Sequence, residues 1–249
     1  MIYITGDCHG RVLQRFSYNK HPFLKNLTAN DTIFVLGDIG LYWPNYEKET
    51  EYQLTNINKP WRTIFIAGNH DNYDFIETLP IVQPNFLISG TIRQDKQFYW
   101  IDKSCILRID SKIILCIAGA KSHDSKYIFE KEEKSAIKIA KRRDLPYRIN
   151  HVTWWGQEEI DIEDARATLE NYGSNKVNYI MSHDAPAHFN NIAKKIDIYN
   201  DYEDSKGELF LEDLDQTLDF DYWYHGHYHF EDYTYENHMC VYHSILPIE

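Results

Sequence analysis

Five short segments of this sequence carry residues that commonly bind metal ions, and each segment follows an apolar run. The residues are Asp7 and His9, Asp38, Asn69 and His70, His183, and His227 and His229. Their carboxylate, amide and imidazole groups suit first-row divalent ions or zinc. Four of the five segments contain a glycine, which permits a tight turn and a close approach of backbone to a ligand. The set predicts a metal centre built from oxygen and nitrogen donors.

A centre of this kind suits the hydrolysis of a phosphate ester. The substrate is an anion, so an attacking hydroxide is repelled unless positive charge shields its approach. Two divalent cations about 3.5–4 Å apart supply that charge, polarise the phosphoryl oxygens and lower the pKa of a bridging water. A shared carboxylate would hold the two like charges together, and Asp38 is the natural candidate.

The elements before these residues must bring them together. Apolar runs of about five residues, typical of buried strands, precede the first three segments: Met1–Thr5, Thr32–Leu36 and Thr63–Ala67. Stretches near Val12–Tyr18 and Glu47–Ile57 have the length and composition of helices. This alternation is typical of an α/β sheet, in which ligands gather at the carboxyl ends of strands.

The rest of the chain adds strands of a second type. Three consecutive apolar runs joined by polar turns predict a meander, and hence a mixed sheet: Gln97–Ile101, Cys105–Ile109 and Lys112–Ala118. A helix is expected over Ile162–Tyr172, with Gly173 at its end. Further strands are expected at Val177–Met181, Tyr222–Tyr224 and Met239–Ser244.

Residues 120–158 break this rhythm, and we interpret them as a lid or insertion within a single domain of residues 1–249. The middle of the segment is basic. Arg142, Arg143 and Arg148 are candidates for bidentate pairing with a substrate phosphate, and the alternative is a solvated helix face. Trp154 and Trp155 would pack in the core or lid, or stack on a nucleobase.

The overall charge limits the kinds of partner. The net charge is −12, from 26 basic and 38 acidic residues, and such a surface repels anionic membranes and nucleic acid. We therefore expect a small phosphorylated substrate, such as a nucleotide, and neither a membrane nor duplex nucleic acid as partner. The four cysteines form no disulfide or zinc pattern, and we find neither a signal peptide nor a membrane span, which indicates a cytoplasmic protein.

Taken in order, the five segments resemble the motifs of the calcineurin-like metallophosphoesterase family. They read GDCHG (6–10), GDIG (37–40), GNHD (68–71), SH (182–183) and GHYH (226–229). Two further segments, SHDSKY (122–127) and YRINHVTWW (147–155), resemble those of its small bacterial and phage-type members. The resemblance implies a mixed α/β fold, a four-layer αββα sandwich of two mixed sheets flanked by helices. The second motif lacks the Asp-Arg-Gly that follows in Ser/Thr protein phosphatases, so that activity is disfavoured.

The resemblance also implies two metal sites that share Asp38. The first would be formed by Asp7, His9, Asp38 and His229, and the second by Asp38, Asn69, His183 and His227. His70 would contact the scissile phosphate and act as general acid or stabilise the leaving oxygen, and Asp71 could orient His70. Six other histidines match no motif, and we assign them to surface or packing: His21, His123, His151, His188, His238 and His243.

The function expected from these residues is a dinuclear, metal-dependent phosphodiesterase or phosphatase in which a metal-bridging hydroxide attacks the ester. Mn²⁺ is the expected metal, with Fe, Zn, Ni and Mg as alternatives, because such donors accept several divalent ions. Two other hypotheses stay open. One is a nuclease of the same family that acts on single-stranded nucleic acid, and the other is a metal-stabilised binding module without turnover.

Overall fold

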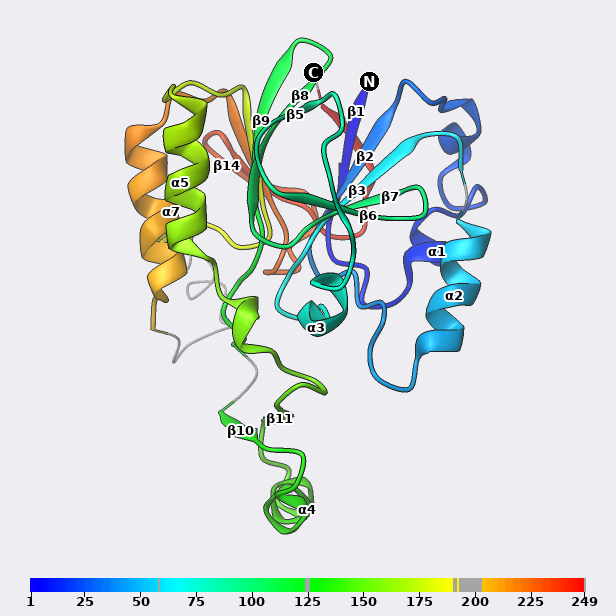
Figure 1. Cartoon of the computed structure of the whole chain (residues 1–249), viewed down its shortest axis with the longest axis vertical. Helices are drawn as coiled ribbons and strands as arrows, with labels where there is room; N and C mark the ends of the chain where they lie inside the picture. Colours follow the sequence, from blue (N-terminus) through cyan, green and yellow to red (C-terminus); the bar gives the residue numbers. More distant parts are fainter. Residues whose placement is uncertain (58, 124–125, 190–191, 193–202, 249) are drawn as a thin grey trace.

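Two β-sheets pack face to face at the centre of the molecule, and helices cover their outer faces (Figure 1). The computed structural model describes residues 1–57, 59–123, 126–189, 192 and 203–248. The first sheet contains β1 (Ile2–Thr5), β2 (Thr32–Leu36), β3 (Arg62–Ile66), β4 (Ile81–Val82), β6 (Ile92–Asp95), β7 (Phe98–Ile101) and β16 (Leu246–Ile248). The second contains β5 (Leu87–Gly90), β8 (Ser104–Ile109), β9 (Lys112–Ile117), β12 (Tyr179–Ser182), β13 (Tyr222–His225), β14 (Tyr233–Tyr235) and β15 (His238–Cys240). The expected αββα sandwich is confirmed.

Both sheets are mixed. Their strand orders are β16-β1-β2-β3-β7-β6-β4 and β14-β15-β13-β12-β9-β8-β5. In the first sheet β1, β2, β3 and β7 run parallel, and in the second β9, β12, β13 and β15 do; the outer strands of each sheet are antiparallel. The parallel centres place the carboxyl ends of neighbouring strands at one edge of each sheet.

The predicted meander over residues 97–118 is wrong in one respect. β8 and β9 form an antiparallel hairpin, but β7 pairs in parallel with β3 in the other sheet. The chain therefore crosses between the sheets at Asp102 and Lys103. A polar turn between two apolar runs marks a change of direction, but it does not specify whether the flanking strands pair with each other.

The central strands of the second sheet are buried on both faces. In β8, Cys105 and Leu107 join the core between the sheets, whereas Ile106 joins a second core beneath the outer helices. β12 repeats this alternation, with Met181 between the sheets and Ile180 on the outer side. Strands covered on both faces read as continuous apolar runs, which is why the sequence revealed them.

Helices lie outside both sheets, and the helix expected over Ile162–Tyr172 has the predicted ends. α1 (Val12–Arg15) and α2 (Glu47–Asn56) lie on the side of the first sheet, and α5 (Ile162–Tyr172) and α7 (Lys206–Thr217) lie on the second (Figure 1). At the start of α5 the Asp161 side chain accepts the Asp164 N–H at 3.0 Å, and Gly173 ends the helix with φ 72°. Ser205 and Glu208 form a capping box at the start of α7. Two further short helices lie between strands of the first sheet in the chain: η1 (Pro22–Asn26) and α3 (Tyr73–Ile76).

The segment interpreted as a lid forms its own small structure. It contains β10 (Tyr127–Phe129), α4 (Lys134–Arg142), β11 (Tyr147–Ile149) and η2 (Gly156–Glu158), and β10 and β11 pair outside the two large sheets. Figure 1 shows β10, β11 and α4 extending away from the two sheets. Residues 124–125 lie outside the described part. That the chain is one domain with a lid stays a prediction.

None of the described helices has both the length and the apolar composition that crossing a bilayer would require. The four cysteines, Cys8, Cys105, Cys116 and Cys240, are buried free thiols.

Candidate metal centre

The five sequence segments meet where the carboxyl ends of strands from both sheets converge. Asp7, Asp38 and Asn69 follow β1, β2 and β3, which are parallel neighbours in the first sheet. His183 directly follows β12, and His227 and His229 follow its parallel neighbour β13. Backbone hydrogen bonds join the loops, with His9 N–H donating to the Asp38 carbonyl at 2.8 Å and Gly226 N–H to the His183 carbonyl at 3.1 Å.

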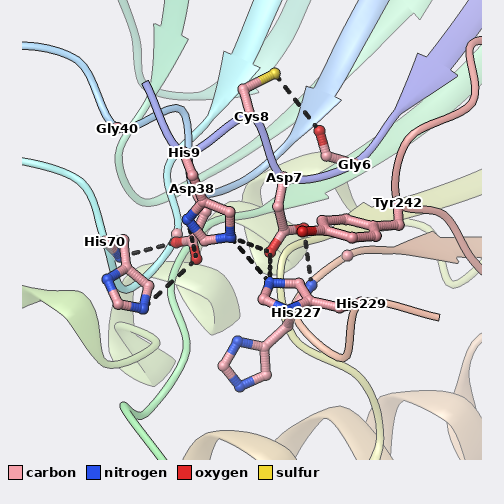
Figure 2. Close-up of polar contacts among 12 residues, drawn as sticks. Gly6, Asp7, Cys8, His9, Asp38, Gly40, His70, His227, His229 and Tyr242 are labelled. Atoms are coloured by element: carbon pink, nitrogen blue, oxygen red, sulfur yellow. Dashed lines mark hydrogen bonds and ion pairs between the residues drawn. The ribbon is translucent and has the colours of Figure 1, made fainter. Parts of the chain in front are cut away.

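Four side chains form a first group of converging donors (Figure 2). The Nε2 atoms of His9 and His229 lie 2.9 Å apart, and His229 Nε2 lies 3.0 Å from Asp7 Oδ2. His9 Nδ1 lies 3.9 Å from Asp38 Oδ2. One donor atom from each of Asp7, His9, Asp38 and His229 falls within 4.8 Å of all the others. This spacing fits a single cation bound by all four.

A second group surrounds the other oxygen of Asp38. His183 Nε2 lies 3.3 Å from Asp38 Oδ1 and 3.0 Å from Asn69 Oδ1, and the rings of His183 and His227 are 4.9 Å apart. His183 Nδ1 lies 2.8 Å from the Leu36 carbonyl oxygen. Because the Nδ1 proton is donated to that carbonyl, Nε2 faces the site and can bind a cation when it gives up its own proton. Since each Asp38 oxygen faces a different group, Asp38 has the position of a bridging carboxylate.

The backbone is strained at four of the seven expected ligands. His9, Asp38, His227 and His229 have φ values of 45°, 46°, 66° and 55°. Non-glycine residues avoid this region, at a cost of roughly 1–3 kcal/mol each, and such strain gathers at functional sites. Gly226 is required for a different reason, because a Cβ there would collide with Asp7 Oδ1 and the Leu36 carbonyl oxygen. The fold thus holds these side chains together against local preference.

The electrostatics of the site favour cation binding. Burial lowers the pKa values of His9 and His227, so both imidazoles are in the neutral form that binds metal ions. Burial also lowers the pKa of His183, but the Asp38 carboxylate beside it outweighs this and raises the pKa to about 10. Burial raises the pKa of Asp38, yet His183 and His70 bring it well below its usual range. Asp38 is therefore an ionised carboxylate in a buried site, and positive charge is held beside it.

Cys8 lies between two of the expected ligands in sequence but turns away from them. Figure 2 shows its thiol on the far side of the backbone from Asp7 and His9, with Sγ 3.7 Å from the Gly6 carbonyl oxygen. Burial raises the pKa of this thiol to about 11, so it stays protonated. Cys8 is not a metal ligand in this arrangement.

Asp71 supports the loops and not the His70 ring. Its carboxylate accepts the backbone N–H groups of Ile39 at 3.2 Å, Gly40 at 2.8 Å and Gly68 at 2.8 Å. Burial and the charge of Asp38 raise the pKa of Asp71 to about 7, against these three hydrogen bonds. The role expected for Asp71 as a partner of the His70 imidazole is corrected accordingly, because both carboxylate oxygens are used by backbone amides.

His70 faces the site beside a residue from the lid. Its backbone N–H donates to Asp38 Oδ1 at 2.8 Å, and its Nε2 lies 3.9 Å from Asp38 Oδ2. One Arg148 guanidinium nitrogen lies 3.0 Å and 3.1 Å from the two His70 ring nitrogens. Of the three arginines singled out in the sequence, Arg148 is thus brought to the site. Arg142 and Arg143 are exposed at the end of α4.

Two residues lie at the site although the sequence analysis did not place them there. His123, which we had assigned to surface or packing, is half-buried, and its Nε2 contacts Nε2 of His227. Arg15 is buried and donates to the carbonyl oxygens of Gly6 at 3.0 Å, Asp7 at 2.7 Å and Tyr242 at 2.6 Å. Neither belongs to one of the five ligand motifs, so neither was predicted to lie at the site.

Two cavities share His9 and Arg11 in their linings. The first, of about 520 Å³, has basic groups in its lining: Arg11, Arg15, Lys20, His21 and His243, together with Asp7 and His9. The second, of about 360 Å³, is lined by His9, Gly10, Arg11, Gly40, Leu41, Trp43, Tyr46, Glu49, Thr50, Gln53 and His70. The first cavity is thus the more basic of the two, and the second contains the rings of Trp43 and Tyr46.

Comparison with a family model agrees with this geometry. A family model described as calcineurin-like phosphoesterase (Metallophos) matches residues 1–231, which include all five segments. A search of curated proteins finds no match. Among solved structures, the phosphopantetheinyl hydrolase of Mycobacterium tuberculosis has 12% sequence identity and a TM-score of 0.37, with 97% of this chain and 87% of that chain covered. A protein of unknown function from Aquifex aeolicus has 21% identity and a TM-score of 0.28, with 67% of this chain and 86% of that chain covered.

Proposed function

The chain belongs to the calcineurin-like phosphoesterase family and is a metal-dependent phosphoric ester hydrolase, and on that premise we propose that it binds two metal ions and cleaves a phosphodiester of a small molecule such as a nucleotide. The observation that supports two ions is the position of Asp38. One of its oxygens faces His9, and the other faces His183. Two bound divalent cations would polarise the phosphoryl oxygens and lower the pKa of a water between them.

The protein's own residues would orient the substrate and handle the leaving group. Arg148 lies beside His70, so a guanidinium and an imidazole face the same point. Arg148 would pair with a phosphoryl oxygen, since guanidinium groups bind phosphate bidentately. His70 would protonate or stabilise the leaving oxygen. Its ring lies nearly parallel to that of Trp43, with 6.4 Å between the centroids, and Trp43 Nε1–H donates to the His70 carbonyl at 2.8 Å, which supports its position.

The preference for a diester is supported by the two cavities. A phosphodiester carries two substituents on phosphorus, and two separate cavities share His9 and Arg11 in their linings. Arg11 and Lys20 would attract an anionic substituent, whereas Trp43 and Tyr46 offer rings on which a base can stack. A phosphomonoester would use only one of them. We further propose Mn²⁺ as the metal and a cytoplasmic location, the latter supported by four free, buried thiols.

The test uses full-length protein that is stripped with EDTA and resupplied with Mn²⁺. Bis(nitrophenyl) phosphate and nitrophenyl phosphate are compared at equal concentration, and faster turnover of the diester is the expected result. Faster turnover of the monoester would overturn the diester proposal and make the enzyme a phosphatase. Asp38→Asn should abolish turnover of both substrates. The matched control is Asp213→Asn, the same change at an exposed position on α7, and it should retain full activity.

A further inference from the structure

A second group of histidines and carboxylates lies apart from the candidate metal centre and shares no residue with it. His188 lies in the segment after β12, Glu212 and Asp215 lie three residues apart on α7, and His238 opens β15. Residues three apart on a helix present side chains on the same face. The two carboxylates therefore point together toward the two imidazoles.

The donor atoms converge. His188 Nδ1 lies 2.8 Å from Glu212 Oε2 and 4.0 Å from Asp215 Oδ2, and His238 Nε2 lies 3.1 Å from Asp215 Oδ1. Donor atoms of His188, Asp215 and His238 all fall within 4.8 Å of one another. Donors at about 2.0–2.1 Å from a tetrahedral zinc ion stand roughly 3.4 Å apart. The distances of 3.1 Å and 4.0 Å from Asp215 to the two imidazoles lie on either side of that value. Small side-chain rotations would therefore bring all three donors to an ion.

His238 gives an independent reason to expect a ligand. Its side chain is 1% exposed, and within the described part of the chain neither ring nitrogen makes a hydrogen bond, although Asp215 Oδ1 is close to Nε2. The ring stacks on Trp223 with centroids 5.5 Å apart, which holds its orientation. A buried polar group without a partner is destabilising by roughly 1–3 kcal/mol. A cation bound between His238 and Asp215 would give the Nε2 lone pair of His238 a partner.

We propose that His188, Asp215 and His238 bind a structural transition-metal ion, with Zn²⁺ as the best match to two imidazoles and a carboxylate. Glu212 positions His188 by accepting its backbone N–H at 2.9 Å. The His188 Nδ1 atom, now 2.8 Å from Glu212 Oε2, would exchange that contact for the ion. The ion joins three segments of the second sheet and its helix. His188 follows His183 by five residues, and His238 pairs with Trp223 in the strand that leads to His227. The site thereby braces the segments that carry two ligands of the catalytic centre.

The test measures zinc bound to the full-length chain after EDTA treatment, resupply with Zn²⁺ and gel filtration. His188→Gln and Asp215→Asn are partly exposed positions, with side chains 29% and 21% exposed, so both variants should fold. Each is expected to bind one equivalent of zinc fewer than the wild type and to lose part of the zinc-dependent rise in melting temperature, while retaining diester turnover with Mn²⁺. The matched control is His151→Gln, which removes an exposed histidine paired with Asp74 at 2.7 Å, and it should bind as much zinc as the wild type.

The comparison of variants does not depend on how many ions the catalytic centre holds, so it is separate from the proposed function. A wild-type zinc count in both His188→Gln and Asp215→Asn would overturn the proposal and leave the group as an ion-pair network. An equal loss of zinc in His151→Gln would overturn it as well, because the effect would then not be specific to this group.

Discussion

Replacing Asp71 by asparagine separates two roles that the sequence and the structure suggest for this residue. If Asp71 anchors the loops that carry Asp38 and Asn69, the variant should lose stability and metal affinity. If it acts through the His70 imidazole, only turnover should fall. The geometry favours the first role, since the carboxylate accepts backbone N–H groups from Ile39, Gly40 and Gly68.

The size of the effect follows from the hydrogen bonds. Oδ2 accepts from Ile39 and Gly68, and Oδ1 accepts from Gly40. An asparagine with its oxygen in the Oδ2 position keeps two of these bonds and turns an amide N–H toward the Gly40 N–H. One buried donor is then unsatisfied, which is destabilising by about 1–3 kcal/mol. Asp71→Ala leaves all three donors unsatisfied, and its loss should be roughly three times as large.

The assay combines urea unfolding in EDTA with a Mn²⁺ titration of diester turnover. Asp71→Asn should unfold at lower urea and need more Mn²⁺ for half-maximal activity. The control is His70→Ala, because the His70 side chain is partly exposed and accepts none of the three backbone N–H groups that Asp71 accepts. It should lose turnover but unfold near the wild-type midpoint. Wild-type stability and a wild-type Mn²⁺ requirement in Asp71→Asn, together with the activity loss of His70→Ala, would refute the anchoring role.

Three further predictions test the site. Removing metal ions with EDTA should abolish turnover and adding Mn²⁺ should restore it; an undiminished rate in EDTA would contradict a metal-dependent reaction. Arg148→Ala should lower kcat/KM for the diester about 10- to 100-fold, since a hydrogen bond to a charged group is worth roughly 1.5–3 kcal/mol. The same change at the exposed Arg142 should have no effect, and an equal loss in both variants would argue against a specific contact. Burial raises the pKa of Glu158 from 4.5 to about 8, against hydrogen bonds from Ser122. The folded state therefore keeps a proton that the unfolded state loses, and stability should fall as pH rises across this window. In EDTA, Glu158→Gln should thus gain in melting temperature over the wild type from about pH 5 to about pH 8, and a gain that does not change with pH would contradict this assignment.

Local patterns in the sequence were sufficient for most of the elements and for the group of side chains that converge at the candidate site. The runs before Asp7, Asp38 and Asn69 are strands with nearly the predicted ends, because strands buried on both faces leave a continuous apolar run. Each ligand motif is short and directly follows its strand. The parallel arrangement of the strands then places the motifs together, so residues far apart in the chain were predictable as one group.

Pairings between elements were not predictable in this way. Nothing in the residues around Asp102 and Lys103 distinguishes a hairpin from a crossing between sheets, and the structure places β7 and β8 in different sheets. The sequence offers no feature that distinguishes Arg148 from Arg142 and Arg143 as a phosphate-binding residue. Only the path of the lid decides that Arg148 reaches His70 and that the other two lie exposed on α4.

The sequence by itself therefore determined the donor types, the strands that carry them and the class of chemistry, since these depend on neighbouring residues. The tertiary structure alone decided which other residues join the site. His123 contacts His227, which lies 104 positions away in the sequence, and Arg15 donates to Tyr242, which lies 227 positions away. Asp71 accepts from Ile39 and Gly40 in the loop after β2, 32 and 31 positions away. Such contacts depend on how two sheets pack together, and no periodicity or motif along one segment records that packing.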